Sequence, residues 1–197
     1  MCVCRFVAGQ IVSILDNARR KYMANASISD LYALIYKQSV VLNEMSAVCN
    51  EMGLTDKAIS LARRALAKNL EMGEFPPTHN DYESLVSGRI AIYDHLAVLL
   101  HYANNQSEAF LLSGVSLALA ENLYKSSAKE QTKNGHALVR ALVSYVQWMP
   151  TSSEISHYTE KIRDLCRQLG IEISADMAAM LRHEEHRATL KPSSLEL

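Results

Sequence analysis

The sequence predicts an all-α fold. Apolar residues recur at steps of three and four residues along most of the chain, which is the period of an amphipathic helix. Only 7 glycines and 4 prolines occur in 197 residues, so turns are few and the helices between them are long. The alternation of β-branched residues that marks strands is scarce. We expect about eight helices in one domain over residues 1–190, followed by a flexible tail at 191–197.

Apolar periodicity and turn residues set the boundaries of the helices. They are predicted, in order, at residues 7–24, 29–52, 56–72, 81–104, 109–125, 128–148, 153–169 and 175–188. The sixth contains Gly135, so a loop through Asn134 with a shorter helix from His136 is the alternative. The fifth is apolar nearly all round, which predicts that it lies in the middle of a helix stack.

Turn residues predict how the helices begin and end. Gly53 and Gly170, each followed by an apolar residue, are expected to adopt the left-handed conformation that ends a helix. Side-chain oxygens that cap a helix N-terminus are expected from the polar residues that precede the predicted helices: Ser27, Thr55, Asn80, Ser107, Ser127 and Ser174.

The helix pair at 29–72 carries a recognisable order of side-chain sizes. Its first helix has large, large, small and large residues at Leu42, Met45, Ser46 and Cys49, and its second helix has small residues at Ala58 and Ala65. This order resembles the tetratricopeptide repeat (TPR), with Gly53 at the turn position. The pair at 81–125 repeats the order around Ala109, with Asn104 in place of the turn glycine.

The resemblance implies a right-handed array of antiparallel helix hairpins, in a divergent, TPR-like form. The hairpins would cover 29–72, 81–125 and 128–169, and the helix at 175–188 would cap the array. Ala58 and Ala109 lie 51 residues apart, whereas the repeat is ~34 residues long. The third hairpin also matches poorly. Alanine-rich helix pairs occur in plain bundles too, which is the alternative interpretation.

The resemblance also implies a protein–protein interaction module. Divergent arrays of this kind are typical of regulatory or sensor domains of bacterial signalling proteins and transcriptional regulators. A peptide or partner domain would bind in a groove lined by the first helix of each hairpin. The implied groove residues are Asn43, Ala47, Asn50, Glu51, Asp94, Val98, His101, Tyr102 and Arg140, and Ser144 and Gln147 would continue the surface. A solvated helix face is the plainer interpretation of the same residues.

Composition excludes several other classes of function. Lys and Arg number 20 against 21 Asp and Glu, without a basic stripe, so direct nucleic-acid binding is not expected. No run approaches the ~18 apolar residues of a membrane span. Cys49 and Cys166 fall on apolar helix faces, and Cys2 and Cys4 lack a matching second pair for a metal site. We expect a cytoplasmic protein without a cofactor.

No catalytic motif is evident, so an enzyme is not expected. His183 and His186 lie three residues apart near a chain end and make a poor metal cage. Trp148 is expected to be a core or hinge anchor. Two other classes of function stay open: a small-molecule-sensing or enzymatic helical bundle, and a structural oligomerisation domain that forms homo-oligomers.

Overall fold

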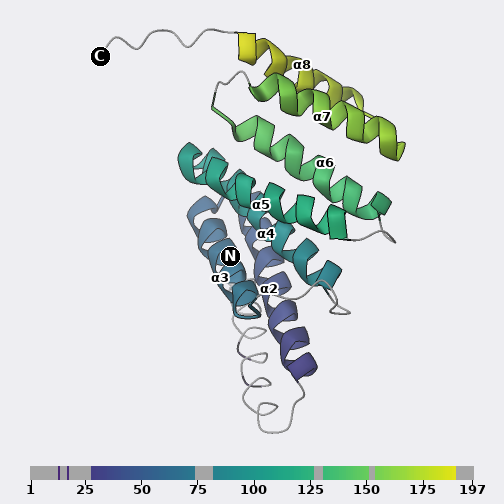
Figure 1. Cartoon of the computed structure of the whole chain (residues 1–197). Coiled ribbons are helices and arrows are strands. Elements are labelled where there is room, and N and C mark those ends of the chain that lie inside the picture. The colour runs from purple at the N-terminus through teal and green to yellow at the C-terminus, as the bar shows by residue number, and fades with distance from the viewer. Residues whose placement is uncertain are drawn as a thin grey trace. The chain divides into compact units, whose positions relative to one another are not determined.

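The computed structural model describes Ser13, Asn17 and residues 28–73, 82–126, 131–150 and 154–189. Within these ranges the chain forms helices and no strand, which confirms the all-α prediction (Figure 1). The helices are α2 (Ile28–Glu51), α3 (Thr55–Leu70), α4 (Tyr82–Tyr102), α5 (Gln106–Ser126), α6 (Gln131–Trp148), α7 (Glu154–Leu169) and α8 (Ala175–Thr189). Most of the predicted helix at 7–24 and the tail at 191–197 lie outside the described residues.

Helix α6 continues through Gly135, so the shorter alternative that starts at His136 is wrong. The neighbouring helix explains the glycine: a Cβ atom at Gly135 would lie 2.1 Å from Leu169 Cδ1 at the end of α7. Gly135 therefore marks a close approach of two helices and not a break in one. A glycine in a helix interior costs about 1 kcal/mol in propensity, which packing has to offset.

Three helices end in the same hydrogen-bonded motif. A residue one or two positions after each helix has a positive φ angle: 72° at Gly53, 61° at Asn104 and 66° at Gly170. The next backbone N–H then donates to the carbonyl five residues earlier, from Leu54 to Cys49 (2.9 Å), Asn105 to Leu100 (2.8 Å) and Ile171 to Cys166 (2.9 Å). These bonds satisfy carbonyl groups that the helix leaves unpaired. The predicted endings are confirmed, including Asn104 in the glycine position.

The helix starts agree less well with the predictions. Ser174 caps α8 as expected, because its Oγ accepts a hydrogen bond from the Met177 N–H at 3.2 Å. The prediction for Thr55 is wrong: Leu54 is the N-cap of α3 and makes no side-chain cap bond. Leu54 already belongs to the motif that ends α2, so α3 begins at once.

The predicted cap at Ser107 is also wrong, because α5 begins at Gln106 and Ser107 lies within it. Asn105 caps this helix: its Oδ1 accepts from the Glu108 N–H at 3.4 Å, and its Nδ2 donates to Glu108 Oε2 at 2.7 Å. The amide thus reaches both the backbone and the side chain of the same residue, in the manner of a capping box. The predicted caps at Ser27, Asn80 and Ser127 lie outside the described residues.

Contacts divide the chain into two units, residues 1–99 and 100–197, and each unit is described by itself. In the first unit α2 packs on α3 through fully buried small side chains, at Ser39, Ser46, Ala58, Ala62 and Ala65. The predicted hairpin at 29–72 is therefore present, with the small residues at the contact. The single domain predicted over residues 1–190 stays a prediction.

A chain of hydrogen bonds joins α2, α3 and α4 in the first unit. Ser46 Oγ donates to the Ala58 carbonyl at 2.7 Å and lies 2.9 Å from His95 Nε2. Because the serine proton is directed to Ala58, Nε2 carries a hydrogen and donates to Ser46. Burial lowers the pKa of His95 below its usual value of 6.5, and the negative charge of Glu44 opposes this shift.

Arg89 closes the C-terminal end of α3 from the neighbouring helix α4. Its Nε donates to Asn69 Oδ1 at 2.7 Å, and its Nη2 donates to the carbonyls of Asn69 (3.2 Å) and Gly73 (2.9 Å). A cation at this position also complements the negative end of the helix dipole. The arginine therefore fixes α3 relative to α4.

The second unit contains α5 to α8, in which consecutive helices pack on one another. Phe110 near the start of α5 stacks on Tyr145 near the end of α6, with ring centroids 5.1 Å apart, so these two helices are antiparallel. Leu169 at the end of α7 meets Gly135 near the start of α6, which makes this pair antiparallel as well. The predicted hairpin at 128–169 and the helix that follows it are present.

Two ion pairs cross between helices of the second unit. Lys161 of α7 lies 2.6 Å from Glu121 of α5. Arg163 binds Glu185 of α8 with both guanidinium ends, and Thr159 Oγ1 donates to the same carboxylate at 3.1 Å. Hydrogen bonding from Arg163 lowers the pKa of Glu185. These contacts link α7 to α5 and to α8.

Helix α5 does not lie buried on all sides. Leu111 is 67% exposed and Val115 is 42% exposed, one turn apart on the same face. The expectation that α5 is enclosed in the middle of a stack is therefore wrong for this face.

No described helix is long and apolar enough to cross a membrane.

We expect Gly88→Ala to destabilise the first unit by about 1 kcal/mol, because the added Cβ would lie 2.7 Å from the ring carbon Cε2 of Tyr36. Gly114→Ala is the matched control: the nearest atom lies 3.5 Å away, so the gain in helix propensity should stabilise by roughly 0.5–1 kcal/mol. Urea denaturation followed by circular dichroism measures both. In a Tyr36→Leu background the penalty at Gly88 should disappear. Equal stabilisation by the two alanines would contradict the predicted clash.

We expect the first unit to lose stability below pH 6.5 through His95. The folded-state pKa lies below the unfolded value of 6.5, so the unfolded chain binds the proton more tightly. The contribution of His95 is complete above that value and is lost as the pH falls towards the folded-state pKa. Melting curves at pH 7.5, 6 and 5 should converge between wild type and His95→Gln as the pH falls. A constant gap between the two would show that His95 does not contribute.

Candidate functional site

The predicted groove residues are distributed over both units. In the first unit Asn43, Ala47, Asn50 and Val98 are half-buried, Glu51 is exposed and Asp94 is buried. In the second unit His101 is half-buried, Tyr102 is 70% exposed and Arg140 is exposed. Because each unit is described by itself, a groove that joins all these residues stays a prediction.

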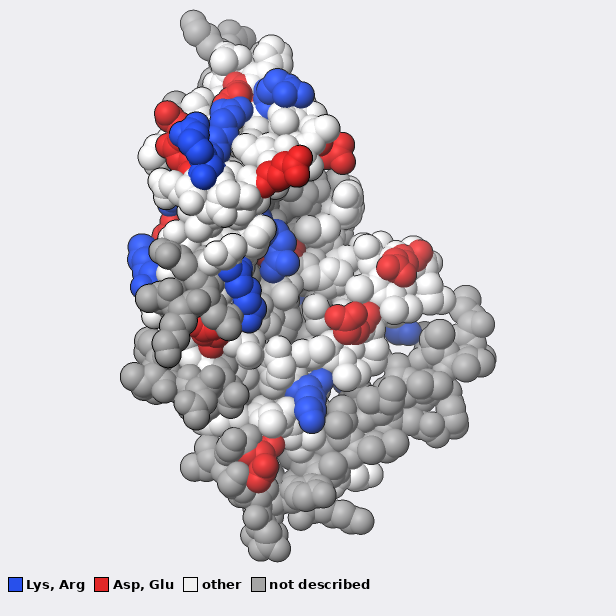
Figure 2. Space-filling model, turned by 90° about the vertical axis from the view of Figure 1, so that its right-hand side faces the viewer, with Lys and Arg blue, Asp and Glu red and all other residues white. Residues whose placement is uncertain are grey.

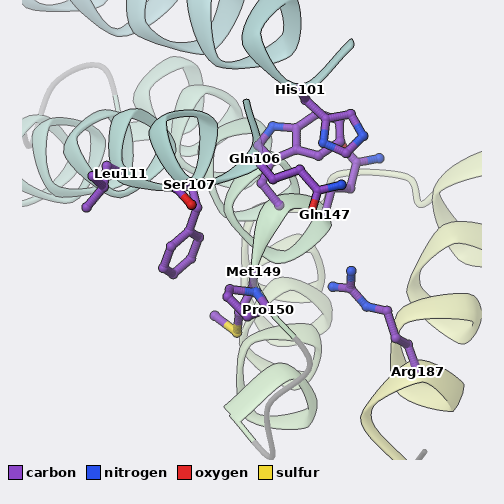
Figure 3. A pocket seen from close by; sticks show the side chains of 10 residues that line it. His101, Gln106, Ser107, Leu111, Gln147, Met149, Pro150 and Arg187 are labelled. Carbon is purple, nitrogen blue, oxygen red and sulfur yellow. The ribbon is translucent and has the colours of Figure 1, made fainter. Parts of the chain in front are cut away.

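A hollow of about 540 Å³ lies within the second unit (Figure 3). The end of α4, the start of α5, the end of α6 with the residues after it, and the end of α8 form its walls. It is lined by His101, Gln106, Ser107, Phe110, Leu111, Gln147, Trp148, Met149, Pro150 and Arg187. The structure thus brings together two residues that the sequence assigned to a binding surface, His101 and Gln147.

Aromatic rings form one wall of the hollow. His101 stacks on Trp148 with ring centroids 4.0 Å apart and an interplanar angle of 28°. Phe110 is held on its other side by the stack with Tyr145. Trp148 is half-buried at the edge of the hollow, so its face is part of a wall and not only an internal anchor. Apolar rings of this kind suit the side chains or backbone of a ligand.

Amide groups provide the neutral polar part of the lining. Gln106 from the start of α5 and Gln147 from α6 point into the same space in Figure 3. Each carboxamide can donate and accept hydrogen bonds, as the peptide backbone does. Leu111 stands at the rim with most of its side chain exposed. The lining therefore combines an apolar floor with groups that suit an extended chain.

Arg187 reaches the hollow from α8 and also closes the end of α6. Figure 3 shows its side chain extending towards the segment that carries Met149 and Pro150. Its Nη2 donates to the Val146 carbonyl at 2.9 Å, and the same carbonyl accepts from the Met149 N–H at 3.3 Å. The same nitrogen lies 2.6 Å from Glu184 Oε2 in an ion pair whose geometry is not that of a hydrogen bond. Sequence reasoning missed Arg187 because it treated α8 as a cap.

A second hollow of about 490 Å³ in the same unit is a weaker candidate. It lies between α5, α6 and α7, and its lining includes the ion-paired residues Lys161 and Glu121. Asp164 in its wall pairs with Arg167 at 2.8 Å. Much of its polar lining is therefore already satisfied within the protein.

On the face shown in Figure 2, Lys and Arg are interspersed with Asp and Glu among the described residues.

The Ser46–His95 hydrogen bond resembles a nucleophile and its base, but Ser46 is fully buried and its proton is directed to a backbone carbonyl. Among the described residues no group of three His, Cys, Asp or Glu side chains could hold a metal ion. His183 instead lies 3.2 Å from Glu184 on its own helix.

We expect Arg187→Ala to lower the free energy of unfolding of the second unit by about 2 kcal/mol, because the buried Glu184 loses its cation and the Val146 carbonyl loses one of its two donors. Trp148, the single tryptophan of the chain, reports unfolding of this unit in urea by its fluorescence. Arg182→Ala removes an exposed arginine from the same helix and should change stability by less than about 0.5 kcal/mol. Equal effects of the two substitutions would exclude a capping role for Arg187.

No protein-family model, no curated protein and no solved structure matches this chain. The geometry of the hollow and the chemistry of its walls are therefore the basis for assigning a function.

Proposed function

We propose that this chain is a protein–protein interaction module that binds a peptide segment of its partner in the hollow of the second unit. The observation that carries the proposal is the lining of the hollow: stacked aromatic rings and apolar side chains, flanked by Gln106 and Gln147. Such a surface provides an apolar pocket for one side chain and amides for the backbone beside it. The proposed regulatory or sensor role follows from this binding.

The arrangement of the helices supports the comparison with a TPR-like array. In the first unit α2 and α4 lie parallel, because Tyr36 meets Gly88 and Ser46 meets His95. First helices that run parallel and alternate with antiparallel second helices are the pattern of stacked hairpins. The first helices α4 and α6 each contribute a side chain to the hollow, at His101 and Gln147.

A small-molecule-sensing bundle is the second candidate, and the size of the hollow favours it. Ligand sites of small molecules usually enclose about 300–1,000 Å³, and this hollow falls within that range. The apolar face of α5 distinguishes the two candidates, since exposed apolar surface continues from Leu111 in the lining of the hollow to Val115 outside it. A peptide can cover such a surface, whereas a small molecule cannot.

We expect Leu111→Asp to abolish most peptide binding without unfolding the protein. Peptides are selected from a library of random dodecapeptides displayed on phage, with the wild-type chain as bait. Burying a leucine side chain contributes about 1.5–3 kcal/mol to binding. Its loss should therefore raise the dissociation constants of the peptides by roughly tenfold or more. Fluorescence polarisation of labelled peptides measures this. Leu111 is 67% exposed, so the folded state should tolerate the change.

Ala118→Asp is the matched control, because it adds the same carboxylate to an exposed position of the same helix outside the hollow. Its dissociation constants should stay within about twofold of wild type. Selected peptides that bind both variants equally well would exclude the hollow as their site, and a library that yields no binder would count against the function.

A further inference from the structure

The lining of the hollow contains a positively charged side chain and no negatively charged one among the described residues. Arg187 is the only Lys, Arg, Asp or Glu among the described residues that line it. The carboxylate that pairs with this arginine, Glu184, is itself buried and is not part of the lining. A ligand in the hollow therefore meets a guanidinium group on an otherwise neutral wall, and no carboxylate that a cationic ligand could pair with.

Arg187 lines the hollow and has N–H groups that no acceptor of the described residues uses. Its Nη2 donates to the Val146 carbonyl and lies beside Glu184. Within the described part of the chain, its Nε is buried without an acceptor and Glu184 Oε2 is buried without a donor. Nη1 lies at the opposite edge of the planar group and makes no hydrogen bond within the described residues. Two N–H groups there remain for an incoming acceptor.

A second donor in the same wall also lacks an acceptor. Trp148 Nε1 is buried and makes no hydrogen bond within the described residues, although the stack with His101 fixes the ring. A buried N–H group without an acceptor costs about 1–3 kcal/mol. Beside these donors, Phe110, Leu111 and Met149 form an apolar surface of the hollow.

We propose that the hollow of the second unit recognises a peptide segment in which an acidic side chain stands next to a large apolar one. The carboxylate accepts hydrogen bonds from Arg187 Nη1, and the apolar side chain packs against Phe110, Leu111 and Met149. Charge complementarity selects this occupant over a basic or a purely apolar segment. The inference rests on the proposed peptide-binding function and adds the chemistry of the partner.

The test begins with the peptides that the wild-type chain selects from the phage library of random dodecapeptides. We expect them to share a large apolar residue with Asp or Glu within two positions of it. Each selected peptide is then synthesised with its acidic residue and with the matching amide, Asn or Gln. Titration of Trp148 fluorescence measures both peptides, because the single tryptophan of the chain lies in the wall of the hollow.

The expected result is a tighter dissociation constant for the acidic peptide by roughly tenfold, as a charge-assisted hydrogen bond provides. In Arg187→Gln this ratio should fall to about one, and in Arg187→Lys it should be intermediate, because lysine keeps the charge but not the planar fork. Arg182→Gln removes an exposed arginine from the same helix and should leave the ratio unchanged. Circular dichroism checks that each variant is folded.

The comparison of acid with amide is made first on the wild-type chain, so it does not depend on the folding of any variant. Peptides that bind through Leu111 but show equal affinity for acid and amide would overturn the inference and leave the proposed function standing. An acid preference that persists in folded Arg187→Gln would also overturn it. Selection of no peptide at all would overturn both.

Discussion

The C-terminal end of a helix carries carbonyl groups that can accept further hydrogen bonds, and in each unit an arginine from another helix donates to such a carbonyl. Arg89 of α4 closes α3 at Asn69 and Gly73, and Arg187 of α8 closes α6 at Val146. Both contacts also fix the distance between two helices. In the second unit this has a consequence for function: the guanidinium that closes α6 is held two residues from Trp148, so helix capping and the wall of the hollow depend on the same side chain.

Small side chains set how closely the helices approach. Ala58, Ala62 and Ala65 of α3 are fully buried against α2, and the space they leave allows Ser46 to reach the Ala58 carbonyl. Gly135 has the same role between α6 and α7, where a Cβ atom would collide with Leu169. Helices at this distance exclude water from the polar groups between them. The hydrogen bond that His95 donates to Ser46 is then formed in a partly buried environment, which is also the reason for the lowered pKa of His95.

Much of the fold follows from local sequence, whereas the site does not. The helices and their endings at Gly53, Asn104 and Gly170 depend on residues within one turn, so pattern and turn chemistry predict them. The caps predicted at Thr55 and Ser107 fail for local reasons as well: Leu54 is already the N-cap position of α3, and the side chain of Asn105 caps α5. Arg187 lies 41 residues from its acceptor Val146, so the local sequence around either residue does not predict this hydrogen bond. Position on a first helix nevertheless identified His101 and Gln147.

The turn at Asn104 explains why this hollow is suited to binding. It separates His101, at the end of α4, from Gln106, at the start of α5, and both residues line the hollow. Backbone bonds from Asn104 to His101 (2.9 Å) and from Asn105 to Leu100 (2.8 Å) fix one side of the turn, and the side chain of Asn105 fixes the other through Glu108. The two wall residues are therefore held in place before any ligand arrives. Binding to a surface that is already ordered loses less conformational entropy, so more of the contact energy appears as affinity. A short rigid turn between two helices thus contributes to recognition although its own side chains do not line the hollow.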